Sequence, residues 1–138
     1  MKKLVIIPAY NEEGGIVKTV TDVVENAKDF DYVVINDCSK DNTLKICREH
    51  SFNVVNLPVN MGIGGGVQTG YMYAYRNGYD IAVQFDGDGQ HNASYLDGNV
   101  RKTCQRTIGY GNWFKIYRKR RISILWNASA WVSGILLD

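Results

Sequence analysis

The chain has 138 residues, of which 45% are hydrophobic and 22% are charged, with 14 Gly and 2 Pro. These values are typical of one globular domain and exclude a disordered or collagen-like chain. The 3 Cys form no C-x-x-C pair and are too few for a disulfide scaffold, which favours a reducing compartment. The apolar run after Lys3 is shorter than the ~7 residues of the smallest signal-peptide core, so we expect a cytoplasmic protein.

The net charge changes sign along the chain near residue 98. Residues 1–98 carry 8 basic and 13 acidic side chains, a net charge of −5, whereas residues 99–138 carry 8 basic and 1 acidic side chain, a net charge of +7. All 3 Trp lie in the second part. Such a step marks a boundary of function or of sequence origin. We therefore predict a domain over residues 1–98 and an atypical basic tail over residues 99–138.

Short apolar runs rich in β-branched residues predict four strands in the first part. Residues 4–7 read Leu-Val-Ile-Ile, as in a strand buried on both faces. Pro8 should end this strand, because proline donates no ladder hydrogen bond. Similar runs lie at residues 32–35, 53–57 and 80–85.

Apolar residues at helical spacing predict helices between these strands. The first helix follows Glu13, and the second begins near Leu44, after the turn and cap residues 39–43. The third begins near Val67, after a glycine-rich loop at residues 62–66. This alternation implies right-handed crossovers and an α/β fold, with a Rossmann-like, mostly parallel sheet covered by helices on both faces.

Ligands of such sheets bind beyond the carboxyl ends of the strands. The loops expected there carry Tyr10 and Glu12 after strand one, Asp37 after strand two, and Asp86 after strand four. Tyr10 could stack on a nucleobase, Glu12 could accept hydrogen bonds from ribose, and Asp37 could accept one from a ring N–H of uracil or guanine. Taken singly, each also fits a half-buried tyrosine or a turn-capping carboxylate.

The sequence Asp86-Gly87-Asp88 places two carboxylates where they could face one divalent cation. Hard oxygen ligands select Mg²⁺ or Mn²⁺, which usually completes its shell with substrate phosphates. A lone D-x-D is more often a solvated turn, so this motif is weak evidence by itself. The residues that follow exclude an EF-hand, because the ligand run and the second helix are missing.

The glycine-rich segment at residues 62–70 could bring backbone N–H groups near a phosphate at a helix start. It matches neither common phosphate fingerprint, since Val67 stands where the dinucleotide motif needs Gly or Ala and G-K-[ST] is absent. Close packing of a helix on the sheet explains the glycines equally well.

Four ordered blocks together resemble the family 2 glycosyltransferases, with a likeness to the dolichol-phosphate-mannose synthase branch and to bacterial polysaccharide glycosyltransferases. The blocks are IPAYNEE at residues 7–13, VINDCSKDNT at 34–43, NMGIGG at 60–65 and QFDGDGQH at 84–91. The resemblance covers about residues 1–96. It implies the GT-A fold, a nucleotide-sugar donor linked to UDP, GDP or dTDP, and a bound divalent metal.

The resemblance also implies roles for individual residues. The metal ligands it implies are Asp86, Asp88 and Gln90. The nucleotide-binding residues it implies are Pro8, Ala9, Tyr10, Glu12, Asp37, Gly62, Gly64 and Asp86. In such enzymes an acidic base from a later segment deprotonates the acceptor, a lipid phosphate or a growing polysaccharide, and the sugar is transferred with inversion.

This chain departs from the family pattern at three places. Cys38 stands where the family usually has Gly, and Ile63 where it often has Lys. After residue 97 the strand that usually reads like G-S-R and the acidic base beyond it have no counterpart, so the catalytic residue stays unassigned. The alternative function is a non-catalytic nucleotide-binding remnant that lacks the acceptor half.

A change of reading frame in the coding DNA could explain why the tail departs from the family pattern. One permitted choice of codons for residues 112–126, read one base later, encodes I-G-S-R-F-I-E-K-E-G-F-Q-S-F, which resembles the missing family segment. We therefore predict that residues from about 98–103 onward are translated out of the ancestral frame.

Two rival interpretations of the tail remain. Residues 122–137 are mostly apolar and follow the basic run at 118–121, a pattern that could place the tail peripherally on the cytoplasmic face of a membrane. The same basic run could contact nucleic acid, but the acidic remainder of the chain argues against a nucleic-acid partner.

Overall fold

The computed structural model describes residues 1–86, 93, 94, 96 and 116–118. Within these residues, five strands form one sheet in the order β3-β2-β1-β4-β5. The strands are β1 (Lys3–Ala9), β2 (Asp31–Asn36), β3 (Val54–Asn56), β4 (Ile81–Gln84) and β5 (Ile116–Arg118). The first four are parallel, and β5 pairs antiparallel with β4.

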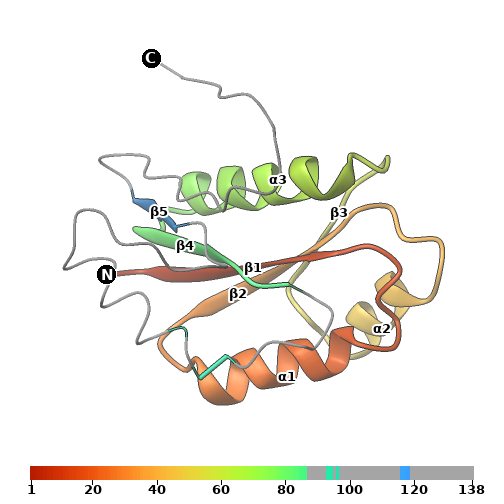
Figure 1. Cartoon of the computed structure of the whole chain (residues 1–138), viewed down its shortest axis with the longest axis horizontal. Coiled ribbons are helices and arrows are strands. Elements are labelled where there is room, and N and C mark those ends of the chain that lie inside the picture. Colours follow the sequence, from red (N-terminus) through yellow and green to blue (C-terminus); the bar gives the residue numbers. More distant parts are fainter. Residues whose placement is uncertain (87–92, 95, 97–115, 119–138) are drawn as a thin grey trace, which may run out of the picture.

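Helices α1 (Ile16–Asn26), α2 (Thr43–Glu49) and α3 (Gly62–Arg76) connect the parallel strands. α1 and α2 cover one face of the sheet, and α3 covers the other (Figure 1). Because side chains alternate along a strand, β1 supplies both cores. Val5 and Ile7 pack with α1 and α2, whereas Leu4 and Ile6 pack on the side of α3. The predicted α/β fold, with a mostly parallel sheet and helices on both faces, is confirmed.

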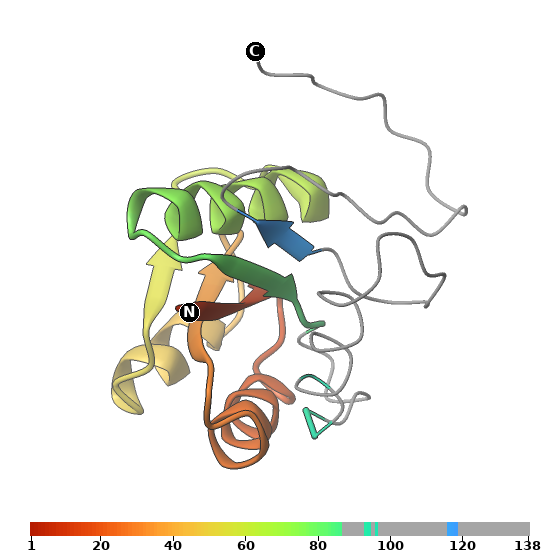
Figure 2. The same cartoon turned by 90° about the vertical axis from the view of Figure 1, so that its left-hand side faces the viewer.

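The order of the strands places a switch point beside β1. From β1 the chain steps outward through β2 to β3, and α3 then carries it back to β4 on the other side of β1. Figure 2 shows α3 crossing the sheet on the face opposite α1. In such sheets the crevice beyond the carboxyl ends of the strands at this switch point is the usual ligand site.

The prediction that Pro8 ends the first strand is wrong, because β1 continues to Ala9 and Pro8 pairs with Ile35 in register. The carbonyl of Ile6 faces β4, where it accepts the N–H of Phe85 at 2.8 Å, and Pro8 faces the same side two residues later. β4 ends opposite Ile6. The missing N–H of Pro8 therefore costs no ladder hydrogen bond.

The prediction of a glycine-rich loop at residues 62–66 is also wrong, since α3 begins at Gly62. Gly62 has a φ of +73°, which glycine adopts without strain. Further along α3, a Cβ on Gly70 would overlap the side chain of Ile6. Close packing of α3 on β1 therefore accounts for one glycine of the segment.

Candidate functional site

The loops that follow β1 and β2 are joined by hydrogen bonds at the carboxyl edge of the sheet. The backbone N–H of Asn11 donates to Ser39 Oγ at 3.0 Å, and Asn11 Oδ1 accepts the N–H of Lys40 at 2.8 Å. The N–H of Glu12 donates to Thr43 Oγ1 at 2.8 Å. These bonds fix the backbone of the first loop relative to the second.

Asp41 and Glu13 complete this connection. Asp41 Oδ1 accepts the N–H and the hydroxyl of Thr43 at 2.9 and 2.6 Å, while Asp41 Oδ2 accepts the N–H of Glu13 at 3.1 Å. In return, Glu13 Oε2 accepts the N–H of Asn42 at 3.0 Å. Partial burial opposes ionisation, but the bonds from Thr43 and Glu13 outweigh it and hold the pKa of Asp41 below its usual value.

A buried amide, that of Asn36, supports the two loops from beneath. Asn36, at the end of β2, is 0% exposed, and its Nδ2 donates to Asn56 Oδ1 at 2.6 Å. Its Oδ1 accepts the hydroxyl of Ser39 at 2.5 Å. A chain of hydrogen bonds therefore runs from β3 through β2 to Ser39, and the hydroxyl of Ser39 accepts the N–H of Asn11 in the first loop. Such connected polar groups hold one arrangement of the loops.

Asp37 is the most constrained of the predicted site residues. Only 4% of it is exposed, and its Oδ1 accepts the N–H of Met61, at the start of α3, at 2.7 Å. Its own N–H donates to the carbonyl of Ala9 at 2.9 Å, and its carbonyl accepts Nδ2 of Asn60 at 3.3 Å. Asp37 therefore links the ends of β1 and β2 to the start of α3.

The other predicted nucleotide-binding residues surround this position. Tyr10 is 42% exposed and Glu12 is half-buried, both in the loop after β1. Pro8 and Ala9 form the end of β1, and Gly62 and Gly64 lie in the first turn of α3. A Cβ added to Gly64 would meet no atom within 4 Å, so packing does not require glycine there.

Asp86 follows β4, on the other side of β1 from Asp37. Its Oδ1 accepts Nε2 of Gln84 at 2.9 Å. The carboxylate is the hard oxygen donor that Mg²⁺ and Mn²⁺ prefer, so its chemistry fits the predicted metal. Asp88 and Gln90 lie outside the described residues. Among the described residues, no three or more His, Cys, Asp or Glu side chains lie close enough together to hold a metal ion.

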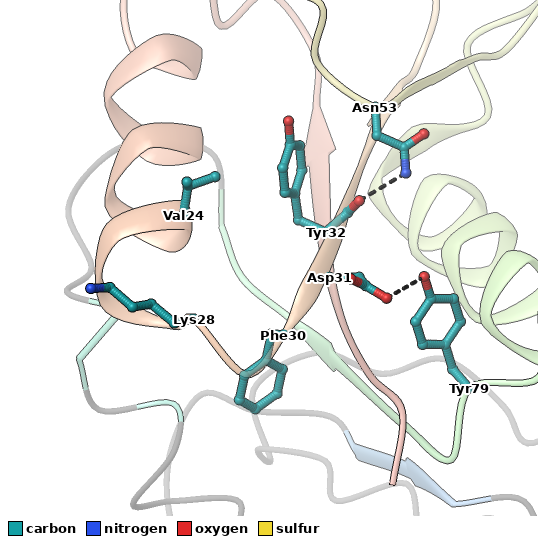
Figure 3. A pocket seen from close by; sticks show the side chains of 7 residues that line it. All are labelled: Val24, Lys28, Phe30, Asp31, Tyr32, Asn53 and Tyr79. Atoms are coloured by element: carbon teal, nitrogen blue, oxygen red, sulfur yellow. Dashed lines mark hydrogen bonds between the residues drawn. The ribbon is translucent and has the colours of Figure 1, made fainter.

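A depression in the described part of the chain lies at the opposite edge, by the starts of β2 and β4 (Figure 3). It has a volume of about 640 Å³. Tyr79 donates its hydroxyl to Asp31 Oδ2 at 2.9 Å in its wall. Burial, together with that bond and the charge of Asp31, raises the pKa of Tyr79 to about 12. None of the predicted nucleotide-binding or metal-binding residues within the described part of the chain lines this depression.

The sequence model of one protein family, described as Glycosyl transferase family 2, matches residues 4–125. The chain belongs to this family. The UDP-N-acetylglucosamine–dolichyl-phosphate N-acetylglucosaminyltransferase of Methanococcus voltae is 41% identical over 62% of this chain and 41% of its own length. The undecaprenyl-phosphate mannosyltransferase of Micrococcus luteus is 30% identical over 70% of this chain and 42% of its own.

A solved structure shares the fold of this family 2 chain. Staphylococcus aureus TarS in complex with UDP superposes with a TM-score of 0.62 and is 26% identical, over 76% of this chain and 32% of that one. The fold is that of the GT-A glycosyltransferases, as the sequence predicted. The chain spans about two fifths of the length of the curated relatives named above.

Several residues that shape the candidate site escaped the sequence analysis. Asn36, Asn60 and Met61 hold Asp37 or its loop, yet a buried asparagine and a backbone N–H carry no recognisable signal in a single sequence. Residues 39–43 were predicted only as turn and cap residues, and the structure shows them bonded to the loop after β1. Their polar composition is the one signal that could have suggested a shared role.

Proposed function

We propose that this chain binds the nucleoside diphosphate of a sugar donor at the carboxyl edge of the sheet, together with Mg²⁺ or Mn²⁺. The observation that carries the proposal is the convergence of three loops there, with Asp37 held at the end of β2, Tyr10 exposed after β1, and Asp86 at the end of β4. A switch point with such side chains is the usual place for a nucleotide.

In this proposal each element of the edge has a separate role. Tyr10 stacks on the base, Glu12 accepts hydrogen bonds from the ribose, and Asp37 accepts one from the base. Gly62 and Gly64 bring the start of α3 near the diphosphate, and Pro8 and Ala9 shape the floor. Asp86, Asp88 and Gln90 hold the metal, which neutralises charge on the leaving diphosphate.

The acceptor we propose is a lipid phosphate, because two curated relatives are named for dolichyl phosphate and undecaprenyl phosphate. A glycan is the alternative acceptor. Transfer would proceed with inversion, and a lipid acceptor would bring the protein to the cytoplasmic face of a membrane. No helix among the described residues has the length and apolar composition needed to cross a bilayer.

A specific observation also supports a second candidate, a nucleotide-binding chain without transferase activity. The only acidic residue after residue 98 is Asp138, whereas the family uses an acidic base from a later segment. Transfer of labelled sugar from a donor to a polyprenyl phosphate by the full chain would exclude this candidate. Metal-dependent nucleotide binding without transfer would favour it.

Calorimetric titration of UDP and GDP into the full chain, with Mn²⁺ or with EDTA, tests donor binding. We expect binding with Mn²⁺, and the variant Asp88→Ala should weaken it at least tenfold, since losing one carboxylate ligand weakens such a metal site. Asp29→Ala is the matched control, because this carboxylate is exposed at the opposite edge and should leave affinity unchanged. Unchanged binding by Asp88→Ala would make the metal assignment wrong.

A further inference from the structure

Asp22 on α1 links this helix to a residue 71 positions further along the chain. Its Oδ2 accepts the backbone N–H of Ala93 at 2.8 Å, and its Oδ1 accepts Nδ2 of Asn26, one turn further along the helix, at 2.7 Å. Rotation of the side chain would break both bonds, so the direction of the carboxylate is fixed. Asp22 is half-buried and is not among the residues proposed to bind nucleotide or metal.

Ala93 is a point at which the chain is back in the core after β4. Ala93 and Leu96 are 0% exposed, and they belong to the same apolar core as Ile16, Val20 and Val23 of α1. The carbonyl of Ala93 accepts the N–H of Leu96 at 3.0 Å, so the peptide groups on both sides of Ala93 are bonded. Apolar packing is non-directional, whereas a hydrogen bond is directional. The bond to Asp22 therefore fixes where along α1 the backbone of Ala93 lies.

The same core holds the chain where it leaves β4. Phe85 is 2% exposed, lies in that core, and donates its N–H to the carbonyl of Ile6 at 2.8 Å. Asp86 follows directly, and its Oδ1 accepts Nε2 of Gln84 at 2.9 Å. The three predicted metal ligands fall within residues 86–92 of the sequence. The residue before this stretch is therefore held on β1, and the residue after it is held on α1.

Fixing both ends of a stretch of chain lowers the conformational entropy that is lost when its side chains gather on an ion. We propose that Asp22 is a positioning residue for the divalent metal. By holding Ala93 against α1 it strengthens the binding of Mg²⁺ or Mn²⁺ without contacting the ion. This inference rests on the proposed function, because it concerns the metal of the same site.

Three substitutions at position 22 separate the effect of the hydrogen bond from the effect of the charge. Asp22→Asn removes the charge and keeps an oxygen for the N–H of Ala93, while its Nδ2 can donate to Oδ1 of Asn26 once that amide is turned over. Asp22→Leu has a side chain of similar length and no acceptor. Asp22→Ala removes both the acceptor and the bulk of the side chain.

The experiment measures the affinity of the full chain and of each variant for UDP by calorimetry over a series of Mn²⁺ concentrations, with thermal unfolding followed alongside. GDP replaces UDP if the wild-type chain binds only GDP. The quantity compared is the Mn²⁺ concentration at which half of the gain in nucleotide affinity is reached. A change that only loosens the fold would lower the unfolding temperature, or the affinity at saturating Mn²⁺, without moving this midpoint.

We expect the Mn²⁺ midpoint to rise about tenfold in Asp22→Leu and Asp22→Ala and to stay within about twofold of wild type in Asp22→Asn, because groups that orient metal ligands typically change metal affinity by tenfold or more. Nucleotide affinity at saturating Mn²⁺ should approach that of the wild-type chain in all three. Glu25→Ala is the matched control. It removes the same charge from the same helix, but Glu25 is exposed and makes no hydrogen bond within the described residues, so the midpoint should not move.

The outcomes separate this inference from the proposed function. A folded Asp22→Leu with the wild-type midpoint would overturn the positioning role and leave the proposed function standing. A midpoint raised as much by Asp22→Asn as by Asp22→Leu would do the same, since it would assign the effect to charge. If Asp22→Ala does not fold, the comparison of Asp22→Leu with Asp22→Asn decides the question. Nucleotide binding by the wild-type chain that does not depend on Mn²⁺, or no binding of UDP or GDP at all, would overturn the proposed function and this inference with it.

Discussion

Cys38 adopts a backbone conformation that glycine prefers, with a φ of +55°. A side chain in this left-handed region costs about 1 kcal/mol, and the one bond found for its thiol is a 3.8 Å contact with the carbonyl of Pro58. The family resemblance gave glycine as the usual residue here. Cys38 in place of glycine therefore keeps the same backbone conformation of the loop but adds strain to it, immediately beside Asp37.

Asp41 should make the stability of the protein depend on pH. Its folded pKa lies below the usual 3.8, so its contribution is present above that pH and is lost as the pH falls through the folded pKa. We expect Asp41→Ala to lower the free energy of unfolding by about 1 kcal/mol at pH 7, through loss of its bonds to Thr43 and Glu13. Urea unfolding at pH 7 and pH 3 measures both effects.

The difference in stability between the wild-type chain and Asp41→Ala should shrink at pH 3. Asp29→Ala serves as the comparison, because its 3.8 Å pair with Lys3 is on an exposed carboxylate and should contribute little. A difference for Asp41→Ala that is equal at both pH values would show that its charge does not hold the two loops together.

At the scale of elements, α3 combines close packing with an open first turn. The helix lies against β1 at Gly70, where a Cβ would overlap Ile6, whereas Gly64 has free space around its Cα. Gly70→Ala should therefore lower the free energy of unfolding by about 1–3 kcal/mol, and Gly64→Ala should raise it by up to about 1 kcal/mol. Chemical denaturation of the two variants measures the contrast.

The variants Gly64→Ala and Gly70→Ala also distinguish an effect on folding from an effect on ligand binding. If Gly64 brings the backbone of α3 near the diphosphate, Gly64→Ala should weaken nucleotide binding even though it stabilises the helix. Stabilisation with unchanged nucleotide affinity would remove Gly64 from the site. Destabilisation by Gly64→Ala equal to that by Gly70→Ala would contradict the packing described for this helix.

At the scale of the whole molecule, the boundary near residue 98 stays a prediction. The family model matches as far as residue 125, and residues 116–118 pair with β4 as β5. The proposed change of frame concerns these same residues. Sequencing the coding DNA from codon 90 past the stop decides the matter, and we expect a second frame that stays open and encodes a segment like G-S-R-F.

The two possible results of sequencing the coding DNA imply different full-length proteins. An open second frame would make this chain the donor-binding half of a longer enzyme. A second frame without that segment would make the basic tail native and refute the predicted change of frame. Binding of the tail to anionic vesicles would then be the property to measure.

The sequence by itself determined the order of the first four strands and three helices, because each depends on apolar spacing within a short window. It also placed Tyr10, Glu12, Asp37 and Asp86 after strand ends, and the parallel sheet brings strand ends to one edge. Only the tertiary structure showed that β1 continues through Pro8. β4 ends opposite Ile6, so no ladder hydrogen bond to the nitrogen of Pro8 is lost. It alone joined Asp37 to Met61, which lies 24 residues away in the chain. Hydrogen bonds between distant segments leave no local pattern, and here they hold the carboxylate of Asp37 in place.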